Sequence, residues 1–262
     1  MTTQERDDRM INWMQALSDH YATLRNRYPN DKLLIVFDID GTIIDMRHII
    51  AHVLQAYDAE HGTSHFAGLV AEAIDVHENF FDDLMSALGV AGPVSKRIEP
   101  WYQESLWSSD TINASHRPFP GVMELIRWFQ SQPHTEVALN TGRPEHMREA
   151  TIQSLNAMAR EYGVEFESDL LWMNAEDWED FIPQTKAVGI RDFRKRGYRI
   201  VAVIDNEPGN IESMVSADDD GEILFLHADT IFKTPITDTP RTVRGSDYDV
   251  TPFLAGQKHA AE

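Results

Sequence analysis

KLLIVFDIDGTIID, residues Lys32–Asp45, is the stretch that decides the fold. Its unbroken apolar run, rich in branched residues and closed by Gly41, predicts a strand of a parallel sheet that is buried on both faces. Open α/β sheets bind ligands at the carboxyl ends of their strands, so Asp38 and Asp40 stand where a site is expected. Two carboxylates this close repel each other unless a cation lies between them, and a divalent cation is the natural candidate.

The DIDGT segment also has a purely structural interpretation. Both Asp side chains can accept backbone N–H groups in a capped turn, with Gly41 supplying a positive φ. For an isolated DxD pattern we would prefer that interpretation. Here the longer DxDGT pattern follows directly on a buried strand, so we favour the functional interpretation.

The composition limits the chemistry that this protein can perform. The 262 residues are enough for one α/β domain that carries an inserted second unit. There is no cysteine, which excludes disulfides, thiolate nucleophiles and Cys-ligated zinc. Any metal must therefore use oxygen or imidazole ligands, and this favours a hard cation such as magnesium.

The charge and the hydropathy pattern bear on partners and location. With 23 basic and 43 acidic residues the formal charge is −20, which disfavours a broad grip on nucleic acid. The sequence has no apolar stretch long enough to span a bilayer, and MTTQERDD lacks the basic start and apolar segment of a signal peptide. We therefore expect a soluble, cytoplasmic protein that does not bind membranes.

The first half of the chain is mainly helical in pattern. An N-terminal helix through about Tyr28 is predicted by an apolar stripe at spacings of three and four. Residues 46–116 carry further helical patterns broken by turn signals, and they read as an inserted helical unit. The breaker-rich segment 117–121 then leads into another amphipathic helix. The stripe of the first helix contains Met10, Met14, Leu17, Tyr21 and Leu24, and that of the last contains Val122, Leu125, Ile126 and Phe129.

The second half alternates apolar strands with helices, as in a parallel sheet with crossover connections. The predicted strands lie near residues 136–140, 169–173, 199–205 and 222–226, and the predicted helices near 145–162, 184–196 and 208–215. Together these patterns predict a Rossmann-like doubly wound parallel sheet. The predicted core comprises residues 1–45 and 117–232, with the inserted unit at 46–116 and a polar, Pro-containing C-terminal extension at 233–262, expected to be a surface extension or partly disordered.

Two further predicted strands end in polar residues. The strand EVALN runs into Thr141-Gly142-Arg143, which places a hydroxyl, a flexible backbone and a guanidinium before the next helix, where an anion can bind. The strand RIVAVI ends in Asp205, a carboxylate that can complete a cation site with Asp38. Lys186 lies early in the helix between these strands, from which it can reach the same edge of the sheet.

With these motifs in this order, the chain resembles the haloacid dehalogenase superfamily of hydrolases, most of which are phosphatases. The resemblance runs from about Lys32 to Leu226. It implies that Asp38 is the nucleophile, which forms an aspartyl-phosphate, and that Asp40 protonates the leaving oxygen and later activates water. An acid at position 40 argues for phosphoryl transfer, since the dehalogenase branch usually lacks it.

The resemblance also implies the ligands of a cofactor and of the phosphoryl group. Mg²⁺ would be held by Asp38, the Asp40 main-chain carbonyl and Asp205. Thr141, Gly142 and Lys186 would bind the transferring phosphoryl oxygens. Where many relatives carry a second carboxylate after Asp205, this chain has Asn206 and then Glu207, and the sequence leaves open which of them contacts the metal or its water.

The inserted unit resembles the C1-type helical cap that closes over small substrates. Arg47 and Arg143 are candidate substrate contacts, although Arg143 can equally brace its loop. His48 and His52 have a spacing compatible with metal ligation, but histidines near a cleft explain them adequately. We expect Glu78, Asp82 and Asp83 on a solvated helix face, and Trp101, Tyr102 and Trp107 in the core of the cap.

The expected function is that of a magnesium-dependent phosphatase acting on a small phosphate monoester. Two alternatives remain open. One is a phosphatase for nucleotides or polynucleotide ends, which the TGRP segment (141–144) permits and the negative charge disfavours. The other is a catalytically silent relative that uses the same pocket for binding.

Overall fold

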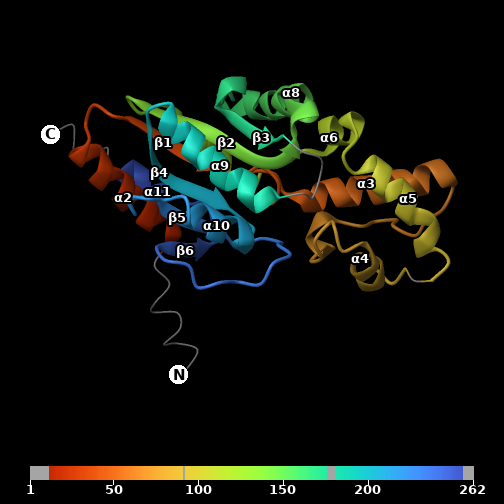
Figure 1. Cartoon of the computed structure of the whole chain (residues 1–262). Helices are drawn as coiled ribbons and strands as arrows, with labels where there is room; N and C mark the ends of the chain where they lie inside the picture. Colours follow the sequence, from red (N-terminus) through yellow and green to blue (C-terminus); the bar gives the residue numbers. More distant parts are fainter. Residues whose placement is uncertain (1–11, 91, 176–180, 256–262) are drawn as a thin grey trace.

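The computed structural model describes residues 12–90, 92–175 and 181–255, arranged as an α/β core with a helical unit at one side (Figure 1). Among these residues one parallel sheet has the strand order β3-β2-β1-β4-β5-β6. The strands are β1 (Lys32–Phe37), β2 (Thr135–Pro144), β3 (Leu171–Asn174), β4 (Tyr198–Asp205), β5 (Leu224–Ala228) and β6 (Thr242–Gly245). The predicted doubly wound parallel sheet is confirmed.

The strand predicted at the start of Lys32–Asp45 lies in the middle of this sheet. β1 pairs with β2 on one side and β4 on the other, and Leu33–Phe37 are fully buried. Helices cover both faces, which is why the strand needs apolar side chains in both directions. On one face α9 (Ile182–Lys195) and α10 (Pro208–Val215) pack on Leu34 and Val36.

The opposite face of the sheet is covered by four helices. They are α2 (Trp13–Arg27), α7 (Val122–Gln130), α8 (Arg148–Ala159) and α11 (Thr251–Ala255), which share an apolar cluster with Leu33, Ile35 and Phe37. The Asn12 side chain caps α2 by accepting the N–H groups of Met14 and Gln15. The predicted stripe residues Met14, Leu17, Tyr21 and Leu24 are buried, whereas Met10 lies outside the described residues.

The segment between β1 and α7 is helical, as the sequence predicts. It contains α3 (Met46–His61), the 3₁₀ turn η1 (Ala71–Ala73), α4 (Phe81–Ala87), α5 (Ser95–Ser105) and α6 (Ser109–Ser115). Figure 1 shows these helices beside the core, with α6 next to α8. In the part of the chain that the structure describes, no helix combines the length and apolarity needed to cross a membrane.

Most predicted elements differ from the observed ones by one or two residues at an end, and two differ by more. β2 continues through the Thr141–Pro144 segment, so the predicted strand end is still extended backbone. The single helix predicted over 145–162 is divided into η2 (Glu145–Met147), α8 and η3 (Arg160–Tyr162), and η4 (Ser168–Leu170) precedes β3.

The expectation of a polar surface extension after residue 232 is wrong for residues 242–255. β6 pairs in parallel with β5, and α11 packs on α2. Tyr248 and Phe253 are each 2% exposed. The reason is that a four-residue edge strand and a five-residue helix are too short to show a hydrophobic period, so the pattern analysis could not detect them.

Candidate active site

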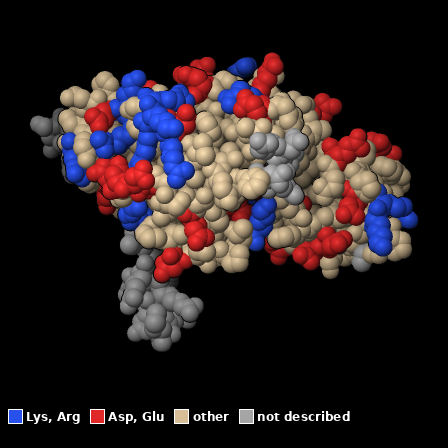
Figure 2. Space-filling model, viewed as in Figure 1, with Lys and Arg blue, Asp and Glu red and all other residues tan. Residues whose placement is uncertain are grey.

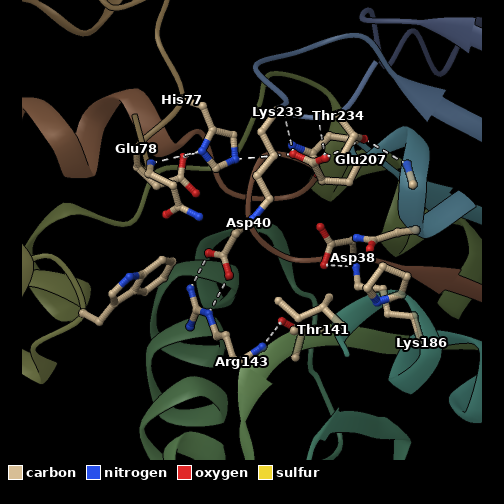
Figure 3. A pocket seen from close by; sticks show the side chains of 18 of the residues that line it. Asp38, Asp40, His77, Glu78, Thr141, Arg143, Lys186, Glu207, Lys233 and Thr234 are labelled. Atoms are coloured by element: carbon tan, nitrogen blue, oxygen red, sulfur yellow. Dashed lines mark hydrogen bonds and ion pairs between the residues drawn. The ribbon is translucent and has the colours of Figure 1, made fainter. Parts of the chain in front are cut away.

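A pocket of about 520 Å³ lies at the carboxyl ends of the central strands, between the core and the helical unit (Figure 3). The core lines it with Asp38, Asp40, Thr141, Gly142 and Lys186. The inserted unit contributes His77, Glu78, Asn79, Gln103 and Trp107. The structure therefore brings the predicted catalytic and phosphate-binding residues together in one cavity.

Lys186 joins two buried carboxylates. Its Nζ lies 2.7 Å from Asp38 Oδ1 and 2.5 Å from Asp205 Oδ2. Burial and the charges of Asp205 and Asp40 together raise the pKa of Asp38 to about 8, against the opposing effect of Lys186. Burial disfavours the charge on Lys186, but Asp205 and Asp38 outweigh it and raise its pKa. One ammonium thus serves two acidic side chains, and the raised pKa of Asp38 shows that the pocket lacks the positive charge needed to ionise both of them at neutral pH.

The loop after β1 is held by close packing. Gly41 has φ +77°, and a Cβ added there would lie 2.1 Å from Nδ2 of Asn206, so only glycine fits. Asn206 donates from Nδ2 to the Ile231 carbonyl at 2.8 Å. Tyr248 donates its hydroxyl to the Thr42 carbonyl at 2.8 Å. The position of the DIDGT loop is therefore set by residues far away in the sequence.

Asp40 is held by Arg143. Arg143 Nε donates to Asp40 Oδ2 at 2.8 Å and its Nη2 to Oδ1 at 2.6 Å, a bidentate pair (Figure 3). The Arg143 side chain is fully buried, and its guanidinium lies 5.6 Å from the centre of the Trp107 ring. Arg143 was a candidate substrate contact, but its donors are directed at Asp40 and at the side chains behind it. The bracing role that the sequence left open is the one that this geometry favours.

A buried histidine completes the support of Arg143. Arg143 Nη2 lies 3.2 Å from His116 Nε2, and His116 Nδ1 lies 2.6 Å from the Ser154 hydroxyl oxygen. A guanidinium can only donate, so Nε2 accepts and the proton of the neutral ring is on Nδ1, which donates to Ser154. Burial and, after it, the Arg143 charge lower the pKa of His116 to about 3.

This lowered pKa predicts a pH dependence of stability. In the unfolded chain the imidazole binds a proton below about pH 6.5, whereas in the folded protein it stays neutral down to about pH 3. Its contribution is therefore fully present above pH 6.5 and is lost as the pH falls towards 3. We expect His116→Gln to show a shallower fall in unfolding free energy than wild type, by up to about 1.4 kcal/mol per pH unit.

Urea unfolding at a series of pH values from 7 downwards measures this slope. His146→Gln is the matched control, because His146 is exposed. Equal slopes for wild type and His116→Gln would contradict the neutral, buried state of His116.

The carboxyl end of β2 forms another wall of the pocket. Thr141 is 1% exposed, and its Oγ1 accepts the Arg143 main-chain N–H at 3.1 Å. A Cβ added to Gly142 would lie 3.0 Å from two carbon atoms of Ile182, so a larger residue would press on the start of α9. This wall therefore presents a hydroxyl and bare backbone to the cavity.

Asp205, Asn206 and Glu207 follow one another at the end of β4 but make different contacts. Asp205 Oδ1 accepts the Glu207 N–H at 2.9 Å and the Asn210 amide at 3.2 Å. Glu207 instead accepts the main-chain N–H groups of Lys233 and Thr234 and lies 3.4 Å from His77 Nε2. Burial raises the pKa of Glu207, but His77 and the Lys233 N–H outweigh it and lower it. Asn206 and Glu207 thus hold the segment 231–234 against the end of β4.

The remaining oxygen donors suit a hard cation. Asp38 and Asp205 are buried acids that share one ammonium, and the Asp40 main-chain carbonyl belongs to the loop that follows Asp38. Within residues 12–90, 92–175 and 181–255, no set of three or more His, Asp or Glu side chains is arranged to hold a metal. Two carboxylates, a carbonyl and water form the donor set that Mg²⁺ prefers, so these residues fit that ion.

Several expectations for the inserted unit are not met. Arg47 does not line the pocket; it pairs with Asp45 through Nε at 2.8 Å and Nη2 at 2.6 Å and lines a second hollow. Glu78 is 9% exposed and lines the pocket, so the expected solvated position is wrong. The pattern failed because Glu78 lies not on a helix but in the loop before α4, where residues 77 and 78 are buried.

The other expectations for this unit have mixed outcomes. Asp82 and Asp83 are exposed on α4, as expected. Tyr102 is buried, but Trp107 lines the pocket beside Arg143. His48 and His52 do not line it, and His48 Nε2 lies 3.8 Å from Asp45 Oδ2; Trp101 packs against the ring of Tyr57.

Among the pocket and support residues that were not found from the sequence, three carry a titratable side chain and are central to the site. They are His77 and Lys233, which line the pocket, and His116, which supports Arg143. All lie in segments without a periodic pattern. His116 directly precedes the breaker-rich segment 117–121, where the chain re-enters the core. This position is the one feature of the sequence that could have indicated that His116 lies near the site.

Comparison with known proteins agrees with this geometry. The haloacid dehalogenase-like hydrolase family matches residues 33–218. No curated protein matches the sequence. The fold is similar to that of protein tyrosine kinase A of Mycobacterium tuberculosis (TM-score 0.53, 15% identity, 87% of this chain and 98% of that one). A haloacid dehalogenase-like family hydrolase of Xanthomonas campestris gives a TM-score of 0.47, with 15% identity over 88% of this chain and 97% of that one. The family match covers most of the chain, which therefore belongs to the haloacid dehalogenase-like hydrolases.

Proposed function

We propose that the protein is a magnesium-dependent phosphatase that hydrolyses a small phosphate monoester through an aspartyl-phosphate intermediate. The observation that carries this proposal is the convergence of Asp38, Asp40, Thr141 and Lys186 on one pocket, with Asp205 behind Lys186. The protein of similar fold from M. tuberculosis is named as a tyrosine kinase, so the fold alone does not identify the reaction. The argument rests on the side chains.

In the first step, an Asp38 carboxylate oxygen attacks phosphorus and the bond to the ester oxygen breaks. The leaving oxygen takes the proton of the Asp40 carboxyl, which yields the alcohol and an aspartyl-phosphate. Arg143 occupies one lone pair on each Asp40 oxygen and so fixes the direction in which the others point. Lys186 and Thr141 offset the charge of the phosphoryl oxygens.

In the second step, the Asp40 carboxylate takes a proton from water, whose oxygen attacks the phosphorus. Phosphate leaves, Asp38 is regenerated as a carboxylate, and Asp40 is again protonated. Asp38, Asp205 and the Asp40 carbonyl would hold Mg²⁺, which supplies the positive charge that lets an anionic nucleophile meet an anionic ester. Burial of the pocket strengthens each of these electrostatic interactions.

The pocket and the surface together support a small substrate. A cavity of about 520 Å³ that is walled by the inserted unit accommodates a metabolite-sized ester rather than a polymer. Figure 2 shows basic side chains gathered over the core but interleaved with acidic ones. Arg194, for example, pairs with Asp218 and Asp220, which leaves little unbalanced positive charge for a nucleic-acid backbone.

A substrate panel tests this proposal. Phosphorylated metabolites and 3′- or 5′-phosphorylated oligonucleotides should be assayed for phosphate release with and without Mg²⁺. We expect magnesium-dependent release from one or more small monoesters. Release from oligonucleotides alone would support a polynucleotide-end phosphatase, and no release from any compound would support a binding protein.

Asp40→Asn is expected to separate proton donation from nucleophilic attack. An alkyl phosphate needs a proton on its leaving oxygen, whereas p-nitrophenyl phosphate has a leaving group that departs as an anion. The variant should lose about 10²–10⁴-fold in kcat on the alkyl ester and much less in the rate of aspartyl-phosphate formation from the aryl ester. Single-turnover kinetics on both esters measure the difference, and equal losses would rule out Asp40 as the acid.

A further inference from the structure

The pocket contains several positively charged side chains, and most of them are paired with carboxylates of the protein. Among the described residues that line it, the full cations are Lys186, Arg143 and Lys233. Lys186 contacts Asp38 and Asp205, and Arg143 is bidentate on Asp40. No ion pair found among the described residues involves Lys233, so its charge is available to a ligand.

The backbone of Lys233 is fixed although its side chain is exposed. Its main-chain N–H donates to Glu207 Oε1 at 2.8 Å, and the Thr234 hydroxyl donates to Glu207 Oε2 at 3.0 Å and accepts the Gly209 N–H at 3.0 Å. Figure 3 shows the Lys233 side chain running from this anchor into the pocket and towards Asp40, whereas Lys186 lies beside Asp38. The anchored segment therefore presents an ammonium group to the part of the pocket that faces the leaving group.

We propose that Lys233 is a specificity-determining residue that binds a second anionic group, a carboxylate or a further phosphate, on the alcohol part of the substrate. The inference rests on the proposed function and names its substrate class: small phosphate monoesters that carry another negative charge. In the proposed function Lys186 and Thr141 bind the transferring phosphoryl group. Lys233, which points towards Asp40, would therefore bind a different anionic group of the substrate.

The neighbouring side chains are compatible with such a ligand. His77 stands between Glu207 and Glu78, with its Nε2 and Nδ1 each 3.4 Å from one of these carboxylates. Burial raises the pKa of Glu78, which weakens the repulsion that it would exert on a second anion. Asn79 and Gln103 add amide groups to the same wall, where they can donate to a carboxylate or phosphate oxygen.

Non-hydrolysable phosphonates test this inference without turnover. Calorimetric titrations in the presence of Mg²⁺ should compare the affinities of two ligands. These are 3-phosphonopropionate, which has a carboxylate, and propylphosphonate, which has a methyl group in its place. The proteins are wild type, Lys233→Met, Lys233→Arg and, as a control, Lys195→Met, which removes an equally exposed charge at the end of α9.

We expect wild type to bind 3-phosphonopropionate more tightly than propylphosphonate. Lys233→Met should weaken 3-phosphonopropionate by about 10-fold or more and leave propylphosphonate within about 2-fold. Lys233→Arg should retain most of the preference, and Lys195→Met all of it. Equal weakening of both ligands by Lys233→Met, or no preference in wild type, would overturn the inference while leaving the proposed function standing. Failure of wild type to bind either phosphonate would also overturn the inference, whereas the proposed function is decided separately by phosphate release in the substrate panel.

Discussion

A purified Asp38→Asn variant is expected to lose about 10⁴-fold or more of its phosphatase kcat, because the amide keeps the shape of the side chain but removes the nucleophile. Asp38 is 6% exposed at the end of β1 and contacts Lys186 directly. Phosphate release with Mg²⁺ and the best ester from the substrate panel provides the measurement. Appreciable magnesium-dependent turnover by this variant would refute the assignment of Asp38.

The stability of the same variant provides the control. The pKa of Asp38 is raised to about 8, so between about pH 4 and 8, in the absence of Mg²⁺, the folded state keeps a proton that the unfolded chain loses, and stability falls as the pH rises through this range. The amide never ionises. Asp38→Asn should therefore unfold at a temperature equal to or above that of wild type at pH 8, with a smaller difference at pH 5. A lower melting temperature at both pH values would mean that lost activity reflects lost structure.

Asp205→Asn is expected to weaken Mg²⁺ binding by about 100-fold or more, since it removes one of two carboxylates that a hard cation would contact. Glu207→Gln should change the affinity by only a few-fold, because Glu207 is bonded to the Lys233 and Thr234 main chain. Calorimetric titration of Mg²⁺ into each variant ranks them without any need for turnover.

Two further variants sharpen this comparison. Asn206→Ala should keep its metal affinity while losing stability, because the Asn206 amide holds the Ile231 carbonyl and packs on Gly41. If instead Glu207→Gln loses Mg²⁺ and Asp205→Asn retains it, the metal site lies two residues further along the chain than we propose.

The sequence predicted the parts of this protein whose signal is local and strong. β1 and β4 are long apolar runs that are buried on both faces, and their ends place Asp38, Asp40 and Asp205 at one edge of the sheet. Position after such a strand decides where a side chain lies, so the convergence of these carboxylates could be predicted. α10 was predicted at its observed bounds because Pro208 marks its first turn.

The parts that could not be predicted depend on contacts between distant segments. The sequence shows that Arg143 lies close after Thr141, but not that Asp40 and His116 accept from its guanidinium or that this group lies over the Trp107 ring. Glu78 and Lys233 enter the pocket from loops, where no periodicity indicates which side chains point inward. Such residues are identified only once the fold has placed the loops.

The position of β6 has a consequence for any attempt to isolate the catalytic unit. The family match ends at residue 218, yet the sheet continues through β5 and β6. A fragment cut at that point would leave the backbone of Ala202–Asp205 in β4 without its partner strand. An unpaired, apolar sheet edge recruits strands from other molecules, so the trimmed fragment is expected to aggregate. Insolubility of such a fragment would then report an open sheet edge rather than a defect in catalysis.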